Sequence, residues 1–152
     1  KMYAGQYLNL AINAYSQLNF PSEETETFVQ LALWQAQFEI SQNNDLDKAL
    51  AILMEFTSHY KIESTFLISF IYKNAIENQS FEWMKYCLSL INSSSSIPNE
   101  WKTQVEFLLA QFYINNNEPE ESKKLIIHLP NSLNKLYLEL KCCILLSSNG
   151  DN

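Results

Sequence analysis

The sequence predicts an all-α fold of antiparallel helical hairpins, with about eight helices in 152 residues. A polar, helix-capping stretch recurs along the chain, and aligning Asp45, Ser80, Glu118 and Asp151 gives spacings of 35, 38 and 33 residues. Such a period is typical of repeated helical hairpins. The chain has only 2 Gly and 4 Pro, too few for the many turns of a β-sandwich or barrel. Its apolar residues, 47% of the chain, recur instead at the three- and four-residue steps of helices.

The composition also bounds the kind of partner. The net charge is −7, and all 10 basic residues are lysines. Without arginine the chain lacks the planar guanidinium that binds phosphate or guanine through two hydrogen bonds, so no nucleic acid is expected as a partner. No apolar run reaches the roughly 18 residues that span a bilayer, and no signal-peptide pattern opens the sequence. We therefore expect an intracellular protein, cytoplasmic or nuclear, without membrane insertion.

The first part of the chain predicts a lone helix and one full hairpin. Residues 3–18 carry an apolar stripe at helical spacing, and Pro21 stops this helix because proline cannot continue the hydrogen-bond ladder. Ser22 can cap the next helix, which runs to about Gln42 with glutamates in its first turn. Asp45 can cap the partner helix. The connection is so short that the two helices must be antiparallel neighbours.

Two further hairpins and a final helix follow. Residues 63–92 form the second hairpin, and the serines at 93–96 form a longer surface loop. The third hairpin opens at Pro98, and its second helix begins near Pro119, where proline suits the first helical turn. The last helix covers residues 132–148, with Gly150 just past its end.

The last predicted helix has no hairpin partner. It carries Leu140 and Ile144, whereas a repeat protein normally ends in a cap with a polar outer face. Residues 1–152 are therefore predicted to be a single helical-repeat domain that forms a segment of a longer solenoid. The alternative is that this helix is itself the cap, with Lys135, Glu139 and Lys141 turned outward.

The spacing of small and apolar residues resembles the tetratricopeptide repeat. That family places a small residue early in its second helix, a larger apolar residue four positions later and a small or apolar residue three beyond. The matching sets are Ala49, Leu53 and Phe56; Met84, Leu88 and Ile91; Ser122, Ile126 and Leu129; and Ala4, Leu8 and Ala11. In the first helices the family pattern is matched best by Leu109, Ala110 and Tyr113, and more loosely by Ala36, Gln37 and Ile40 and by Ile71, Tyr72 and Ala75.

The resemblance implies a right-handed superhelix of antiparallel hairpins, a TPR-like α-α solenoid, with degenerate repeats. The glycine of the family's inter-helix turn is replaced by Asn44, Gln79 and Asn117, and remains only at Gly150. Asparagine tolerates the left-handed backbone conformation better than most residues, so these turns can form.

The resemblance also implies a site, because members of the family bind proteins or peptides along the concave surface formed by their first helices. Of the residues at these positions only Lys73 is cationic, so a clamp for a partner's carboxylates is not expected. The apolar residues at these positions, Trp34, Phe38, Phe107, Leu140 and Ile144, predict an apolar groove. The alternative is that the register is displaced by one residue, or that these side chains belong to the core. The candidate partner-binding residues are Trp34, Phe38, Lys73, Phe107, Gln111, Leu140 and Ile144.

No residue pattern predicts catalysis, a metal or a cofactor. His59 and His128 lie near predicted helix ends and lack metal-ligand spacing, and the three cysteines are expected to be reduced and buried. We therefore expect a non-enzymatic scaffold or adaptor that binds a partner segment within a larger intracellular complex. The alternative is an architectural segment that self-associates through its terminal helices or packs on flanking repeats.

Overall fold

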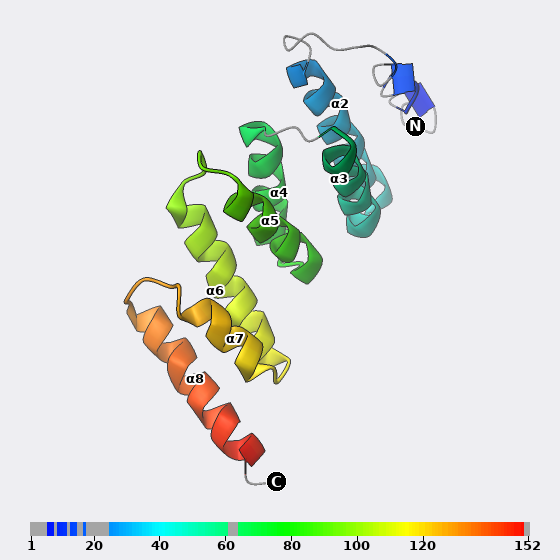
Figure 1. The fold of residues 1–152 in the computed structure, drawn as a ribbon. Coiled ribbons are helices and arrows are strands. Elements are labelled where there is room, and N and C mark those ends of the chain that lie inside the picture. The colour runs from blue at the N-terminus through cyan, green and yellow to red at the C-terminus, as the bar shows by residue number, and fades with distance from the viewer. Residues whose placement is uncertain are drawn as a thin grey trace. The chain divides into compact units, whose positions relative to one another are not determined.

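The computed structural model describes residues 6–7, 9–11, 13–14, 17, 25–60 and 64–150. All the elements within these ranges are helices, and no strand occurs among them (Figure 1). The predicted all-α class is therefore confirmed. Most of the predicted helix at 3–18, together with Pro21 and Ser22, lies outside the described residues.

The chain divides into two compact units, residues 1–70 and 71–152, with the boundary inside helix α4 (Thr65–Asn78). The prediction of one repeat domain stays a prediction.

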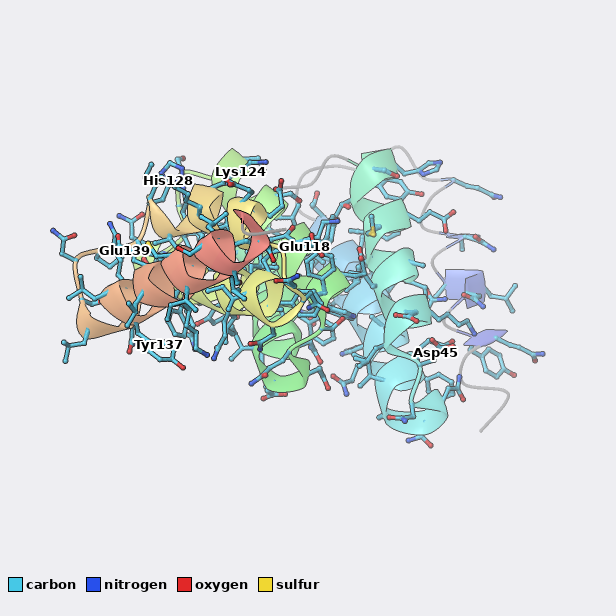
Figure 2. All side chains as sticks on the ribbon, turned by 90° about the horizontal axis from the view of Figure 1, so that it is seen from below. Asp45, Glu118, Lys124, His128, Tyr137 and Glu139 are labelled. Atoms are coloured by element: carbon cyan, nitrogen blue, oxygen red, sulfur yellow. The ribbon has the colours of Figure 1, made fainter. Side chains whose placement is uncertain are left out.

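Unit 1 contains the first full hairpin. Helix α2 (Thr25–Phe38) continues into a π-helical turn, η2 (Glu39–Asn43), and packs on helix α3 (Leu46–Tyr60). Asp45 caps α3 as predicted, since its carboxylate accepts a 2.9 Å hydrogen bond from the backbone N–H of Lys48 (Figure 2). The buried apolar residues of this hairpin are Phe28, Val29, Ala32, Leu33, Ala36, Ala49, Leu50, Leu53 and Phe56.

Unit 2 is centred on helix α6 (Asn99–Asn115). Helices α5 (Phe81–Ser93), α7 (Pro119–Ile126) and α8 (Leu133–Gly150) all contact α6, and α7 also contacts α8. This arrangement confirms the predicted boundaries of the third hairpin and of the last helix to within a few residues. One core cluster joins α6, the α7 region and α8 through Ala110, Ile114, Ile126, Leu129, Leu138 and Cys142.

The turns that close the hairpins have the predicted backbone conformation. Asn44, Gln79 and Asn117 have φ values of 52°, 47° and 60°, and they are the non-glycine residues with positive φ within the described ranges. At Asn117 the turn makes both hydrogen bonds of a Schellman motif, from its own N–H to Ile114 (3.1 Å) and from the next N–H to Tyr113 (2.8 Å). Gly150 differs, because α8 extends through it and its φ is not positive.

The small residues of the second helices are buried as the repeat pattern predicts. Ala49 and Ser122 are both 0% exposed, and Met84 is 2% exposed. The Ser122 hydroxyl donates a 2.8 Å hydrogen bond to the backbone carbonyl of Ala110 on α6, so the two helices approach closely at this point. A larger side chain in either helix would separate them.

The first hairpin departs from the expected register by one residue. Gln37 was matched to the small position of the family, yet it is exposed, while Ala36 is 0% exposed. The π-helical turn at the end of α2 contains one more residue per turn than an α-helix. If α-helical spacing is assumed between the turn residue Asn44 and α2, the small position therefore falls on Gln37, one residue after Ala36. The small residue of this helix is therefore Ala36.

Replacing Gln79 by glycine is expected to stabilise the protein by about 0.5–1 kcal/mol, because glycine adopts positive φ without steric cost. Glu77→Gly, two residues earlier and inside α4, is expected to destabilise it by about 1 kcal/mol. Urea unfolding of both variants measures the two effects. Equal destabilisation by both substitutions would contradict the role of Gln79 in the turn.

Ser122→Ala is expected to cost about 1 kcal/mol through the lost hydrogen bond, and Ser122→Leu about 1–3 kcal/mol through overpacking against α6. Ser89→Ala and Ser89→Leu are the matched controls, since Ser89 is exposed on α5. Thermal unfolding should rank Ser122→Leu as the least stable of the four. A Ser122→Leu variant as stable as its Ser89 counterpart would show that α6 and α7 do not need a small residue here.

Candidate functional site

The candidate residues of unit 1 lie at the end of α2. Trp34 is 59% exposed, which places its indole on the surface and not in the core. Phe38 is half-buried and is the last residue before the π-helical turn. Both residues belong to the helix whose register differs by one residue from the family pattern at Gln37. The exposure of Trp34 is nevertheless the feature that a partner could use.

The π-helical turn places a carboxylate under the neighbouring helix. Glu39 is 6% exposed, and its two carboxylate oxygens accept hydrogen bonds from Lys48 on α3 (2.9 Å) and from the side-chain amide of Asn43 (2.5 Å). The bond from Lys48 holds the pKa of Glu39 below its ordinary value of 4.5, against the opposing effect of burial. The same bond raises the pKa of Lys48. This ion pair fixes η2 to α3 directly after Phe38.

Phe107 lines a pocket of about 420 Å³ in unit 2, between α6 and the start of α8. Its apolar wall is formed by Phe107, Leu129 and Pro130, which is the kind of surface that takes up an apolar side chain. Lys135 is held at the edge, because its ammonium donates a 3.0 Å hydrogen bond to the carbonyl of Leu129. The polar residues around the mouth are Asn99, Glu100, Thr103, Gln104, Ser132, Asn134 and Lys135.

An aromatic pair lies beside this pocket. The rings of Tyr72 and Trp101 stack with centroids 4.5 Å apart and an angle of 5° between their planes. The Tyr72 hydroxyl donates a hydrogen bond to the side chain of Gln104, which lines the pocket. These contacts fix the orientation of the first half of α6.

The other candidates of unit 2 do not share the pocket of Phe107. Gln111 lines a separate hollow of about 160 Å³, together with Met84 and Leu108. Lys73 is exposed and forms a surface ion pair of 3.9 Å with Glu77. Gln111 and Lys73 are therefore not among the residues that line the pocket of Phe107.

Helix α8 carries a stripe of exposed apolar side chains. Leu140 and Ile144, predicted from the repeat register, are 60% and 59% exposed. Sequence reasoning missed three further members of this stripe, although their three- and four-residue spacing from Leu140 was a readable signal. They are Leu133, Leu136 and Tyr137, with exposures of 84%, 60% and 50%.

The charged residues of α8 are less exposed than its apolar stripe. Lys135, Glu139 and Lys141 are all half-buried, and Figure 2 shows Glu139 and Tyr137 on opposite sides of the helix. The Lys141 ammonium lies 4.7 Å from the centroid of the Tyr137 ring, a cation–π contact. This pattern is the reverse of the polar-faced cap that was the alternative expectation for the last helix.

The remaining titratable groups do not form a reactive cluster within the described part of the chain. Cys87 and Cys142 are buried as predicted, but Cys143 is exposed, so the expectation of three buried cysteines is wrong. Burial raises the pKa of Cys87 to about 12, which keeps it a thiol. Among the described residues no three His, Cys, Asp or Glu side chains are placed to hold a metal ion.

One further carboxylate is buried in α6. Glu106 is 4% exposed, and its carboxylate lies 3.9 Å from the ammonium of Lys102, one helical turn earlier. Burial raises the pKa of Glu106, while the positive charges of Lys102 and His128 oppose this effect. The residue belongs to the interior of unit 2 and not to the Phe107 pocket.

No protein-family model, curated protein or solved structure matches this chain. Within the described ranges, no helix combines the length and the apolar character that crossing a bilayer requires. The candidate surfaces are thus defined by their geometry alone.

Glu39→Gln is expected to lower the free energy of unfolding by about 1–3 kcal/mol at neutral pH, because it removes hydrogen bonds to a charged group. Since the folded pKa of Glu39 is below 4.5, the contribution of the charge is complete above that pH and is lost as pH falls through the folded pKa. The difference between wild type and Glu39→Gln should therefore shrink in acid. Urea unfolding across pH measures it, with the exposed Glu55→Gln as control, and a difference that does not change with pH would contradict the ion pair.

Proposed function

We propose that this chain is a non-enzymatic scaffold or adaptor that binds a segment of a partner protein within a larger intracellular assembly. The single observation that carries the proposal is the pocket at Phe107, an apolar hollow surrounded by polar side chains and large enough for a partner's side chain. The exposed indole of Trp34 in unit 1 adds a second apolar contact point. The finer form of the proposal is a TPR-like right-handed superhelix, supported by the recurring left-handed turns and buried small residues.

The mechanism follows from the lining of the pocket. An apolar side chain of the partner loses contact with water against Phe107, Leu129 and Pro130, which contributes about 1.5–3 kcal/mol for a fully buried leucine or phenylalanine. The amides of Asn99, Gln104 and Asn134 supply donors and acceptors for the backbone of an extended segment. Such pockets give specificity for the inserted side chain, while backbone hydrogen bonds fix its position.

A second candidate function is architectural. The observation that favours it is the exposed stripe of α8, because a monomeric protein rarely leaves so many large apolar side chains in contact with water on one helix. In this candidate the chain packs through α8 on another helix, and the Phe107 pocket has no role.

The Phe107 pocket is tested with a library of displayed random peptides selected on the 152-residue chain. Phe107→Ala is expected to weaken the selected peptides by about tenfold or more, because a pocket residue at the centre of an interface usually dominates its affinity. Thr103→Tyr, which fills the pocket without removing any core contact of Phe107, should have the same effect. Ile127→Ala is the matched control, since Ile127 is 71% exposed and does not line this pocket.

Selected peptides that bind both pocket variants as tightly as wild type would place the binding site elsewhere. If no peptide is selected at all, the scaffold proposal loses its support and the architectural candidate remains. Circular dichroism and thermal unfolding accompany each measurement, so that a loss of fold is not mistaken for a loss of binding. The Trp34→Ala, Phe38→Ala double variant applies the same test to unit 1.

A further inference from the structure

The exposed stripe of α8 is the largest departure of this structure from an ordinary protein surface. It consists of side chains that recur every three or four residues and therefore form one continuous face of the helix. We refer to it as the α8 face. Its members are Leu133, Leu136, Tyr137, Leu140 and Ile144.

We propose that the α8 face is the interface of a symmetric homodimer, in which the occupant of the face is the α8 helix of a second copy of this chain. This inference deepens the architectural candidate and does not depend on the Phe107 pocket. Three properties of the face carry it.

The first property is its area. Together the five side chains expose on the order of 500 Å² of mostly apolar surface, given their exposures of 50–84%. Two copies placed face to face then bury on the order of 1,000 Å², which reaches the roughly 1,000 Å² expected of a specific interface. A separate pocket beside α8, lined by Cys143 and Ile127, has a volume of about 190 Å³. It is too small to take up the α8 face of a second copy.

The second property is that dimer formation leaves no charged group buried without a contact. The Lys135 ammonium is bonded to the carbonyl of Leu129, and the Lys141 ammonium contacts the Tyr137 ring of its own helix. Glu139 is half-buried on the side of α8 opposite Tyr137 (Figure 2). A second copy of the same face therefore meets no acidic side chain, and the long aliphatic stem of Lys141 lets its ammonium stay in water at the edge of the interface.

The third property is that all five members of the face are uncharged, and the Lys141 ammonium beside Tyr137 lies next to the face without being one of its members. A heterologous partner is normally selected by complementary charges as well as by apolar contact. An apolar face without charged members is complementary to itself, and a two-fold axis places Leu against Leu or Tyr without any further requirement.

The full 152-residue chain is examined by analytical ultracentrifugation from about 1 µM to about 500 µM. We expect a reversible monomer–dimer equilibrium. Because each chain carries a net charge of −7, added salt should screen the repulsion between copies and tighten the dimer. Weakening by salt would show that charge pairs and not the apolar face hold the two copies together, and would overturn the proposal.

Leu140→Asp is expected to raise the dimer dissociation constant by about a hundredfold, since it buries a carboxylate at the centre of the face. Leu136→Lys should act in the same way and serves as a second variant if the first folds poorly. Met54→Asp is the matched control, because Met54 is 46% exposed on α3 in unit 1. A control that dissociates equally would assign the effect to general destabilisation.

The decisive measurement mixes two variants that are each monomeric. Leu140→Asp and Leu140→Lys should form a heterodimer when combined, because opposite charges then meet across the interface. Neither a folding defect nor a heterologous partner predicts this rescue. A wild-type chain that stays monomeric at the highest concentration, or a dimer that persists in the α8 variants, would refute the α8 face as the interface.

Whether or not the chain dimerises through α8, the scaffold proposal is tested by a separate measurement. Peptide binding at the Phe107 pocket is measured on the monomeric Leu140→Asp variant. If this variant still binds the peptides, the pocket and the α8 face act independently. If no variant binds the peptides, the result counts against the pocket and not against the dimer interface.

Discussion

The tight turn between paired helices is the constraint on which the rest of the structure depends. A residue in the left-handed conformation reverses the chain within a few residues, so the following helix must return along the preceding one. Asn117 shows the full arrangement, with its turn closed by hydrogen bonds to Ile114 and Tyr113. Close return requires small residues where the helices meet, which is why Ser122 is fully buried and bonded to the backbone of α6. Turn conformation and small-residue spacing are thus two consequences of one geometry.

The first hairpin shows how this geometry absorbs an extra residue. The π-helical turn η2 adds a residue before Asn44, and the α2 register shifts so that Ala36 is buried and Gln37 is exposed. The added residue brings the Glu39 carboxylate into the hairpin, where it needs hydrogen-bond partners. Lys48 and Asn43 supply them, so the irregular turn is stabilised by polar contacts and not by apolar packing.

The same apolar periodicity produces both core and surface in unit 2. Leu138 and Cys142 on one side of α8 are buried against α6 and α7, while Leu140 and Ile144 on the other side are exposed. The charged side chains between them are half-buried, since lysine can lay its aliphatic stem along apolar surface and keep its ammonium at the edge. A helix that is apolar on two sides requires a covering element on each side, and α6 and α7 together cover one side of α8. The α8 face and the Phe107 pocket are therefore different kinds of surface, a flat stripe and a hollow.

The sequence by itself determined the described helices to within a few residues of their ends, because these depend on local spacing and capping, and it identified the turns at Asn44 and Asn117, because Asn tolerates positive φ. It also identified Leu140 and Ile144 as apolar positions of the last helix. Only the tertiary structure decided which of two apolar faces each helix buries, because the spacing of apolar residues identifies a face of the helix but not the element that packs on it. For the same reason it alone separated Gln111 from the pocket of Phe107 and showed Trp34 on the surface. The register of α2 was decided by η2, since an inserted π-helical residue depends on the contacts of Glu39 with the neighbouring helix and leaves no mark in the local sequence.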